Sequence, residues 1–342
     1  MQLAAWPKLS SKPMLNNRPK IGIALSGASG RAIAHIAVLE VLREHRIPID
    51  IIVGCSSGAI IAASFAVGTM DKLKIFIHEL TFPKLLRLWS TKNAKGGLFH
   101  LHNDHMNKEL NVITRGLNFE DIQSVKLAFS ATDLNTGELV TLSKGNINKA
   151  FKASVAIPGL LEPMVSEGRV LVDGGLVNIV PTLPAKQLGA DIVIGINLAA
   201  TKFIYEKRMP IWRGYRFLTR LMGLQFIREK VIPKLSPRLL FRIDTQSDVL
   251  EAKDIKIPGV MSVLSKAIDH SFEISEQWDE SHVACDLMIE PNVKHFGKVE
   301  LRSLEKIYEE GRRAGEAAIP EIKKLIAEFE SSVLSQQAEV TA

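Results

Sequence analysis

Two short segments of the chain carry the residue types needed for acyl transfer. The first, Gly54-Cys55-Ser56-Ser57-Gly58, fits G-x-S-x-G, in which a serine stands on a sharp turn between a strand and a helix. Gly54 and Gly58 let the backbone make that turn, and the Ser57 amide would lie at a helix N-terminus, where it can stabilise a negative oxygen. The pattern predicts Ser56 as a nucleophile; its simpler interpretation is a small-residue turn that only joins strand to helix.

A serine hydroxyl needs a base to remove its proton. The later histidines, His270, His282 and His295, lie in no recognisable strand-end loop, although His295 before Phe296-Gly297 is the least implausible of the three. Asp173 is the stronger candidate, because it ends a predicted strand and two glycines follow it, so its carboxylate can approach another loop closely. The alternative for this segment is an Asp-Gly turn that closes a hairpin.

A loop of small residues, Ser26-Gly27-Ala28-Ser29-Gly30-Arg31, joins the first predicted strand to the first helix. The spacing of Gly27 and Gly30 does not fit the dinucleotide pattern G-x-G-x-x-G, and the G-K-[ST] of a phosphate-binding loop is absent. The remaining use of such a loop is to direct amides at a transient negative oxygen.

The elements that must position these residues follow from apolar runs. Ile21–Leu25 and Ile51–Val53 read as buried strands, and helices are predicted over Arg31–Arg43 and from Ser57 onward. A strand, a crossover helix and a second strand indicate a parallel sheet. Further predicted elements are strands at Val125–Ala131, Arg169–Val172 and Asp191–Ile196, a helix over Ile147–Ala156 ended by Pro158-Gly159, an irregular Leu80–Asn111, and a charged helix over Ser303–Glu330 interrupted by Pro320.

Five blocks in order give the sequence a family resemblance. They are LSGASGRAIAHIAVLEVL (Leu25–Leu42), GCSSG (Gly54–Gly58), ATDLNTGE (Ala131–Glu138), KASVAIPGLLEP (Lys152–Pro163) and VDGGLVNIVPTLPAKQLGAD (Val172–Asp191), with a weaker ACDLMIEPNV (Ala284–Val293) that looks like a closing strand. Together they resemble the patatin-like phospholipases, serine acyl hydrolases related to the neuropathy target esterase group. The resemblance covers residues 20–198 well and 284–317 loosely.

The resemblance implies an α/β fold of three layers, α/β/α, with a mainly parallel sheet. It also implies a Ser–Asp dyad of Ser56 and Asp173 without a catalytic histidine, metal or cofactor. The oxyanion loop falls on Gly27, Ala28 and Ser29, Arg31 matches the basic residue after it, and Gly174 and Gly175 complete the D-G-G motif. We expect the two dyad oxygens to lie about 3 Å apart across two neighbouring strand ends.

The oxyanion loop departs from the family pattern. Three glycines usually stand where this chain has Gly27-Ala28-Ser29, Gly30 replaces a common Ala, and Ala32 replaces a glycine. If position 28 or 29 needs a positive φ, a Cβ there costs about 1 kcal/mol. Loss of one oxyanion donor reduces the rate of acyl transfer by ~10²–10³.

Charge is concentrated in one segment. The chain has 43 Lys+Arg and 37 Asp+Glu, and residues 202–242 hold eleven of the bases, two of the acids and seven aromatic residues. A basic helix with aromatic residues suits an anionic lipid surface, with Arg213, Arg216 and Arg220 on one face and Trp212 beside them. A solvated helix packed on the core is the alternative; no nucleic-acid motif accompanies the charge.

These features suggest five segments: a polar arm (1–19), the catalytic domain (20–198), a basic aromatic-rich helical insertion or lid (199–280), a closing strand with C-terminal helices (281–330) and a disordered tail (331–342). Two cysteines and no apolar leader predict a reduced cytosolic chain without a signal peptide. The uncharged run Ile51–Met70 reads as strand, turn and helix rather than as a membrane span. His100, His102 and His105 are interpreted as a solvated loop rather than a metal site.

The sequence therefore predicts a cytosolic hydrolase of phospholipid or lysophospholipid esters that works at a membrane surface. The alternatives are a soluble carboxylesterase or thioesterase with the same dyad, and a weakly active relative that binds membrane or protein. Head-group, sn-position and chain-length preference, and the oligomeric state, do not follow from the sequence.

Overall fold

The protein is described from a computed structural model. The described residues are 18–81, 84, 88, 97–99, 101, 103–198, 271, 284–297 and 303–341. The helices among them are α1 Ile33–Glu44, α2 Ser57–Val67, α3 Met70–His78, α5 Asp104–Thr114, α6 Ile147–Ser154, α7 Thr182–Gln187 and α11 Leu304–Thr341. The strands are β1 Ile21–Leu25, β2 Ile51–Cys55, β3 Gly97–Phe99, β4 Lys126–Asp133, β5 Leu139–Leu142, β6 Gly159–Leu161, β7 Met164–Ser166, β8 Arg169–Asp173, β9 Ile192–Ile196 and β10 Leu287–Ile289.

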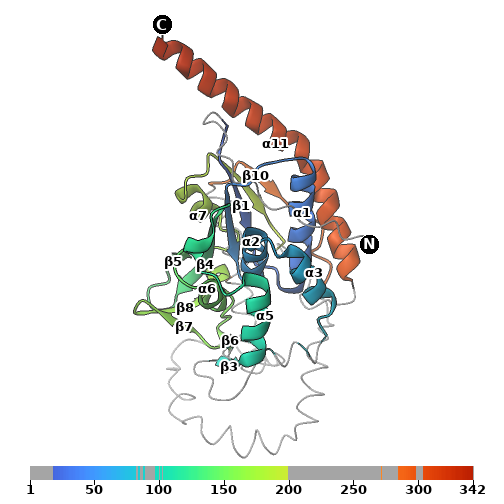
Figure 1. The fold of residues 1–342 in the computed structure, drawn as a ribbon, viewed down its shortest axis with the longest axis vertical. Coiled ribbons are helices and arrows are strands. Elements are labelled where there is room, and N and C mark those ends of the chain that lie inside the picture. Colours follow the sequence, from blue (N-terminus) through green and yellow to red (C-terminus); the bar gives the residue numbers. More distant parts are fainter. Residues whose placement is uncertain are drawn as a thin grey trace, which may run out of the picture. The chain divides into compact units, whose positions relative to one another are not determined.

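A mixed, mostly parallel sheet forms the centre of the described fold (Figure 1). Its strands are hydrogen-bonded in the succession β10-β9-β1-β2-β4-β8-β7, and β5 also pairs with β4. The first five strands run parallel, whereas β5 and β8 are antiparallel to β4, and β7 is antiparallel to β8. The α/β fold predicted from the sequence is confirmed, with an antiparallel part at one end of the sheet.

The pairing of β4 brings two strands together end to end. Along β4, Phe129 and Ser130 pair with both β2 and β5, while Ala131 and Thr132 pair with both β5 and β8. Because a strand has only two hydrogen-bonding edges, β2 and β8 must occupy the same edge of β4, on the side away from β5. They run toward one another and stop at consecutive positions of β4. The ends of the two strands are therefore neighbours, as expected, but they meet head-on along one edge of β4 instead of lying side by side.

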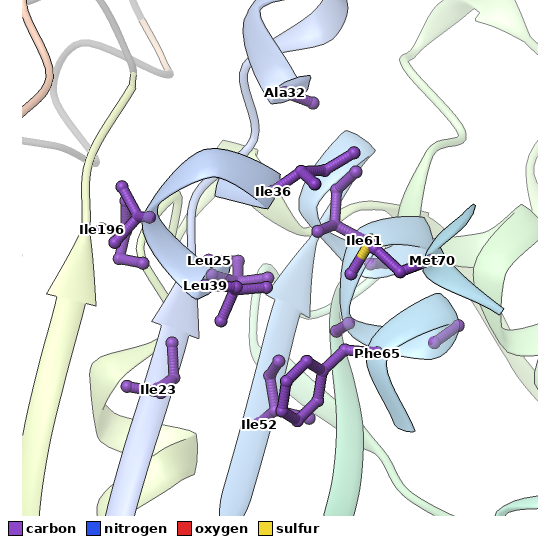
Figure 2. Packing of buried hydrophobic residues seen from close by; sticks show 14 of the residues in the cluster. Ile23, Leu25, Ala32, Ile36, Leu39, Ile52, Ile61, Phe65, Met70 and Ile196 are labelled. Carbon is purple, nitrogen blue, oxygen red and sulfur yellow. The ribbon is translucent and has the colours of Figure 1, made fainter. Parts of the chain in front are cut away.

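Alternation of side chains along the strands explains the layers. In β1, Ile23 and Leu25 join the large core cluster with α1 and α2. Gly22 faces the other way, where a Cβ would lie 3.4 Å from that of Ala185 in α7 and 2.7 Å from that of Ala190 after this helix. Figure 2 shows this cluster, in which the side chains of α1 and α2 meet those of β1, β2 and β9. Figure 1 shows α7 and α1 on opposite sides of the sheet. The burial of both faces explains why these strands are continuous apolar runs.

The C-terminal helix α11 packs along α1 through two glycines. A Cβ on Gly311 would lie 2.5 Å from the carbonyl oxygen of Ala34, and one on Gly315 would lie 3.1 Å from the Cβ of Val41. The absence of side chains at these two positions, one turn apart, lets the two helix backbones approach closely. The helix therefore covers α1 as a second layer on that side of the sheet.

Three sequence expectations about elements are wrong. The segment Leu80–Asn111 is not irregular throughout, because α5 begins at Asp104, with its Met106 amide capped by the side chain of Asn103. The C-terminal helix continues through Pro320, and it also continues through most of the expected disordered tail to Thr341.

Within the described residues no helix is long and apolar enough to cross a membrane.

Candidate active site

Ser56 lies on a strained turn between β2 and α2. Its backbone has φ 51° and ψ −121°, an uncommon conformation for a residue with a Cβ. The flanking glycines make the turn possible: a Cβ on Gly54 would lie 2.5 Å from the Cα of Ala59, and one on Gly58 would lie 2.5 Å from the carbonyl oxygen of Leu25. The two glycines thus have a steric role on either side of Ser56, and α2 begins directly against the end of β1.

A residue that the sequence analysis did not single out holds this turn. The Ser56 amide donates a hydrogen bond of 2.9 Å to the hydroxyl of Ser154, which is completely buried at the end of α6. The Ser56 carbonyl accepts from the Ala59 amide, also at 2.9 Å. Ser154 lies within the block Lys152–Pro163 of the family resemblance, so its block was visible in the sequence although its contact was not.

The structure brings the Ser56 hydroxyl and the Asp173 carboxylate together. Ser56 Oγ donates to Asp173 Oδ2 at 2.7 Å, and Asp173 Oδ1 accepts from the Gly175 amide at 2.9 Å. Asp173 is the last residue of β8, so the contact forms where β8 meets the end of β2. Gly174 must lack a side chain here, because a Cβ would lie 2.6 Å from the carbonyl oxygen of Ser130. The backbone of the D-G-G segment therefore passes close to the backbone of β4.

Burial sets the proton affinity of the Asp173 carboxyl. The side chain is almost fully buried, and the resulting loss of solvation raises its pKa to about 6 from 3.8. The hydrogen bonds from Ser56 and Gly175 stabilise the charged form and act in the opposite direction, lowering the pKa. At neutral pH the group is therefore mainly a carboxylate, and it is a stronger proton acceptor than an exposed one.

The predicted oxyanion loop lies beside the turn, with its amides differently engaged. The Gly27 amide donates to the carbonyl of Ile179 at 3.2 Å, and the Ala28 amide donates to the Ser57 hydroxyl at 2.9 Å. Ser29 has φ 53°, so position 29 is the one that demands a positive φ, while Ala28 has an extended φ of −151°. Ala28 and Ser57 are thus brought together, and the Gly27 amide is directed at the protein itself.

Arg31 anchors the loop rather than facing the dyad. It is buried, its Nε donates to the carbonyl of Phe296 at 3.1 Å, and a terminal guanidinium nitrogen donates to the carbonyl of Leu198 at 3.2 Å. Gly30 lies in the 3-10 turn Ser29–Ala32 that follows the loop. The basic residue therefore ties the start of α1 to the chain after β9 and β10.

No histidine among the described residues bonds to either dyad oxygen. His295 lies against the ring of Phe296, with centroids 4.0 Å apart, and the completely buried His35 bonds the carbonyl of Ser26 at 2.9 Å. In the part of the chain that the structure covers, no group of three or more His, Cys, Asp or Glu side chains is arranged to hold a metal ion. Several residues considered in the sequence analysis lie outside the described residues: His100, His102, His270, His282, Trp212, Arg213, Arg216 and Arg220.

Comparison with known proteins points to one family. A family model described as "Patatin-like phospholipase" matches residues 23–186. An uncharacterized NTE family protein of Mycobacterium tuberculosis is 30% identical over 185 residues, which are 54% of this chain and 50% of that protein. A lysophospholipase of Emericella nidulans is 23% identical over 320 residues, which are 89% of this chain and 18% of that protein.

The relatives are longer than the matched part. A second uncharacterized NTE family protein of Mycobacterium tuberculosis is 28% identical over 316 residues, covering 87% of this chain and 46% of that protein. The chain thus spans about half the length of these mycobacterial relatives. Among solved structures, that of VipD from Legionella pneumophila aligns with a TM-score of 0.42 and 13% identity, covering 89% of this chain and 67% of that one.

Proposed function

Because the chain carries a patatin-like phospholipase domain over residues 23–186 and its relatives include NTE family proteins, we propose that it is a serine-dependent lipid acyl hydrolase. It cleaves carboxylic esters of phospholipids or lysophospholipids, with Ser56 as nucleophile and Asp173 as base. The observation that carries the proposal is the 2.7 Å hydrogen bond from the Ser56 hydroxyl to a buried carboxylate.

The first half of the reaction acylates the enzyme. Ser56 Oγ attacks the ester carbonyl carbon while its proton passes to Asp173 Oδ2 along the existing hydrogen bond. The carbonyl oxygen becomes an oxyanion, for which the N-terminal end of α2 offers amide hydrogens and a favourable dipole. When the intermediate collapses, the bond to the leaving alcohol breaks, the alcohol takes the proton from Asp173, and the acyl group stays on Ser56.

The second half releases the fatty acid. Asp173 takes a proton from water as the water oxygen attacks the acyl carbon, and a second oxyanion forms. Collapse of this intermediate expels Ser56 Oγ, which recovers its proton from Asp173. The carboxyl group thus accepts and returns one proton in each half-reaction. A pKa raised to about 6 suits this alternation better than the usual 3.8.

The dyad is compatible with more than one class of ester substrate. The basic, aromatic-rich segment 202–242 supports a substrate held at an anionic membrane surface, on the basis of its composition alone. A soluble carboxylesterase or thioesterase would use the same dyad. The occupied amides of Gly27 and Ala28 favour a third alternative, a weakly active relative that acts through binding.

The test combines a fluorophosphonate probe with product analysis by mass spectrometry. Wild type is expected to label and to release fatty acid from at least one phospholipid or lysophospholipid, while Ser56→Ala does neither. Ser64→Ala is the matched control, because Ser64 is a buried serine in the C-terminal half of α2, and among the described residues its hydroxyl is hydrogen-bonded only to that of Thr69, at 3.4 Å. It is expected to label normally.

Each outcome separates the candidates. If the protein hydrolyses small esters or thioesters but releases no product from lipids, the lipid hydrolase proposal is contradicted and the soluble esterase or thioesterase is supported. Absence of labelling in a folded wild type would contradict the enzyme and favour the binding protein. For the membrane contact, Arg213→Glu, Arg216→Glu and Arg220→Glu together are expected to reduce sedimentation with anionic liposomes; unchanged sedimentation would contradict it.

A further inference from the structure

The contact between Ala28 and Ser57 joins the predicted oxyanion loop to the residue that follows the nucleophile. Ser57 follows the nucleophile and is the first residue of α2, and its hydroxyl oxygen accepts a hydrogen bond from the Ala28 amide at 2.9 Å. Of the three loop residues predicted to supply amides, two have their amide engaged within the protein, Gly27 by a carbonyl and Ala28 by this hydroxyl. The first turn of α2 consequently contributes a side chain as well as backbone to this corner of the site.

A serine hydroxyl can accept and donate at the same time. It has two lone pairs and one hydrogen, and the Ala28 amide uses one of the lone pairs. Among the described residues the Ser57 hydroxyl donates no hydrogen bond, and Ser57 is partly exposed next to Ser56. The hydrogen is therefore available to a group that arrives with the substrate.

We propose that the Ser57 hydroxyl is a donor of the oxyanion hole, giving its hydrogen to the oxyanion while accepting the Ala28 amide. The inference rests on the proposed acyl hydrolase function and deepens it. No bond is made or broken at Ser57: the hydroxyl keeps its proton and only turns it toward the oxygen that becomes negative. The Ala28 amide polarises the hydroxyl, because a hydrogen-bonded chain strengthens its own terminal donor.

This arrangement accounts for the altered loop. Ser29 carries a Cβ at φ 53°, so the loop differs from one built of glycines at a position whose backbone conformation favours glycine. The loop turns its Ala28 amide to Ser57 and its Gly27 amide to Ile179. A side-chain donor from the first turn of α2 then takes the place of these two amides.

The experiment measures kcat and KM separately for Ser57→Ala and Ser57→Thr, using an ester that the wild type hydrolyses in a Ser56-dependent manner. Ser57→Ala is expected to lower kcat by about 10²-fold with little change in KM, since the lost bond forms only in the transition state. Ser57→Thr keeps the hydroxyl and is expected to retain most of kcat. The acid limb of the pH profile should stay at the wild-type position in both, because Asp173 is untouched.

Unfolding curves and the Ser64→Ala control separate this role from a structural one. A Ser57→Ala variant with kcat within twofold of wild type, or faster, would overturn the proposal, because the Ala28 amide would then bind the oxygen itself. Equal losses in Ser57→Ala and Ser57→Thr would overturn it too. If wild type has no Ser56-dependent turnover, the proposed function fails and this inference falls with it; with turnover present, only the inference is at stake.

Discussion

At the residue scale, burial of the Asp173 side chain makes its carboxylate a better base but lowers the free energy of unfolding at neutral pH. Burial raises its pKa to about 6, so the folded protein binds a proton between pH 4 and 6 that the unfolded chain does not bind. Above pH 6 the native state must hold a buried charge, and a shift from 3.8 to about 6 corresponds to a penalty of about 3 kcal/mol. The penalty disappears as the pH falls through 6 toward 4.

The first prediction concerns this carboxyl. The kcat of the wild type should fall as the pH drops through about 6, because protonated Asp173 cannot accept the Ser56 proton. Asp173→Asn should lose turnover yet be more stable than wild type at pH 8, by about 1–3 kcal/mol, since it buries no charge. The measurements are a pH–rate profile and urea unfolding of both proteins.

Comparing the free energies of unfolding of wild type and Asp173→Asn at each pH cancels the contributions of the other titratable groups. Burial lowers the pKa of His35 to about 4, so acidification from pH 6.5 destabilises both proteins alike. The stability advantage of Asp173→Asn should therefore be largest at pH 8 and vanish near pH 4. An advantage that does not change with pH would refute the assigned cause.

A second prediction follows from the backbone of Ser29, which has φ 53°. Ser29→Gly should raise the free energy of unfolding by about 0.5–1 kcal/mol, because glycine adopts this conformation without a Cβ penalty. Ser29→Val should lower it, because a branched side chain tolerates that conformation least. Chemical denaturation measures both.

The matched control is Glu167→Gly, since Glu167 has φ 50° in the turn between β7 and β8, away from the dyad. It should give a similar gain in stability without any change in kcat. A loss of stability in both glycine variants would mean that positive φ is not a source of strain in this chain.

The residues of the candidate site differ in how far the sequence can predict them. Ser56 and Asp173 are recognisable because each stands in a short pattern of small residues. The bond from Ser154 to the Ser56 amide, and that from Ala28 to Ser57, join segments that are distant in sequence. Such contacts depend on how α6 and the loop after β1 pack, which no local pattern encodes.

At the element scale, the start of α2 is pressed against the end of β1. A Cβ on Gly58 would lie 2.5 Å from the carbonyl of Leu25 and 2.7 Å from that of Ser26. The third prediction is that Gly58→Ala displaces the helix start, lowers the free energy of unfolding by about 1–3 kcal/mol and reduces kcat more than tenfold. Denaturation and steady-state kinetics measure the two effects.

Gly68 provides the control at the other end of the same helix. It has φ 73° and no atom within 4 Å of its hypothetical Cβ, so Gly68→Ala should cost about 1 kcal/mol of stability through backbone strain alone. Its kcat should equal that of wild type. Normal kinetics in Gly58→Ala would show that the contact with β1 does not position Ser56.

The strands were more predictable than the segments around them. Buried parallel strands such as β1 are continuous apolar runs, and the predicted Ile21–Leu25 agrees with the structure residue for residue. The helix α5 was missed, although Met106, Leu110 and Ile113 have helical spacing and face the core. Pro320 did not end α11, because the buried neighbours Ile319 and Ile322 keep the helix packed across the lost hydrogen bond.

At the scale of the whole molecule, α11 packs against α1, which lies far from it in the sequence. Beside the two glycines, Tyr308 of α11 donates to Glu40 of α1, which also accepts from Lys74 of α3 at 2.7 Å. This buried charged group has all its members hydrogen-bonded, so it fixes one arrangement of three helices more than it adds stability. The Arg312–Glu44 pair on the same contact is partly exposed and contributes less.

The fourth prediction tests this docking. Gly311→Ala should lower the free energy of unfolding, although alanine favours a helix by about 1 kcal/mol, because the new Cβ would lie 2.5 Å from the Ala34 carbonyl. Gly315→Ala, whose nearest atom would be the Val41 Cβ at 3.1 Å, should be affected less. Limited proteolysis and urea unfolding check the order; a more stable Gly311→Ala would refute the close approach.

The head-on meeting of β2 and β8 has a consequence for how such a molecule can change. The gap between nucleophile and base is set by two successive rungs of β4, Ser130 and Ala131, and not by the length of the chain that connects them. The turns between Asp133 and Arg169 can therefore lengthen while the reacting pair keeps its spacing, provided that α6 still presents Ser154 to the Ser56 amide. One extra residue inside β4 would instead turn its side chains to the opposite face. The distance between nucleophile and base is thus fixed by the register of β4, independently of the length of the turns that connect its neighbours.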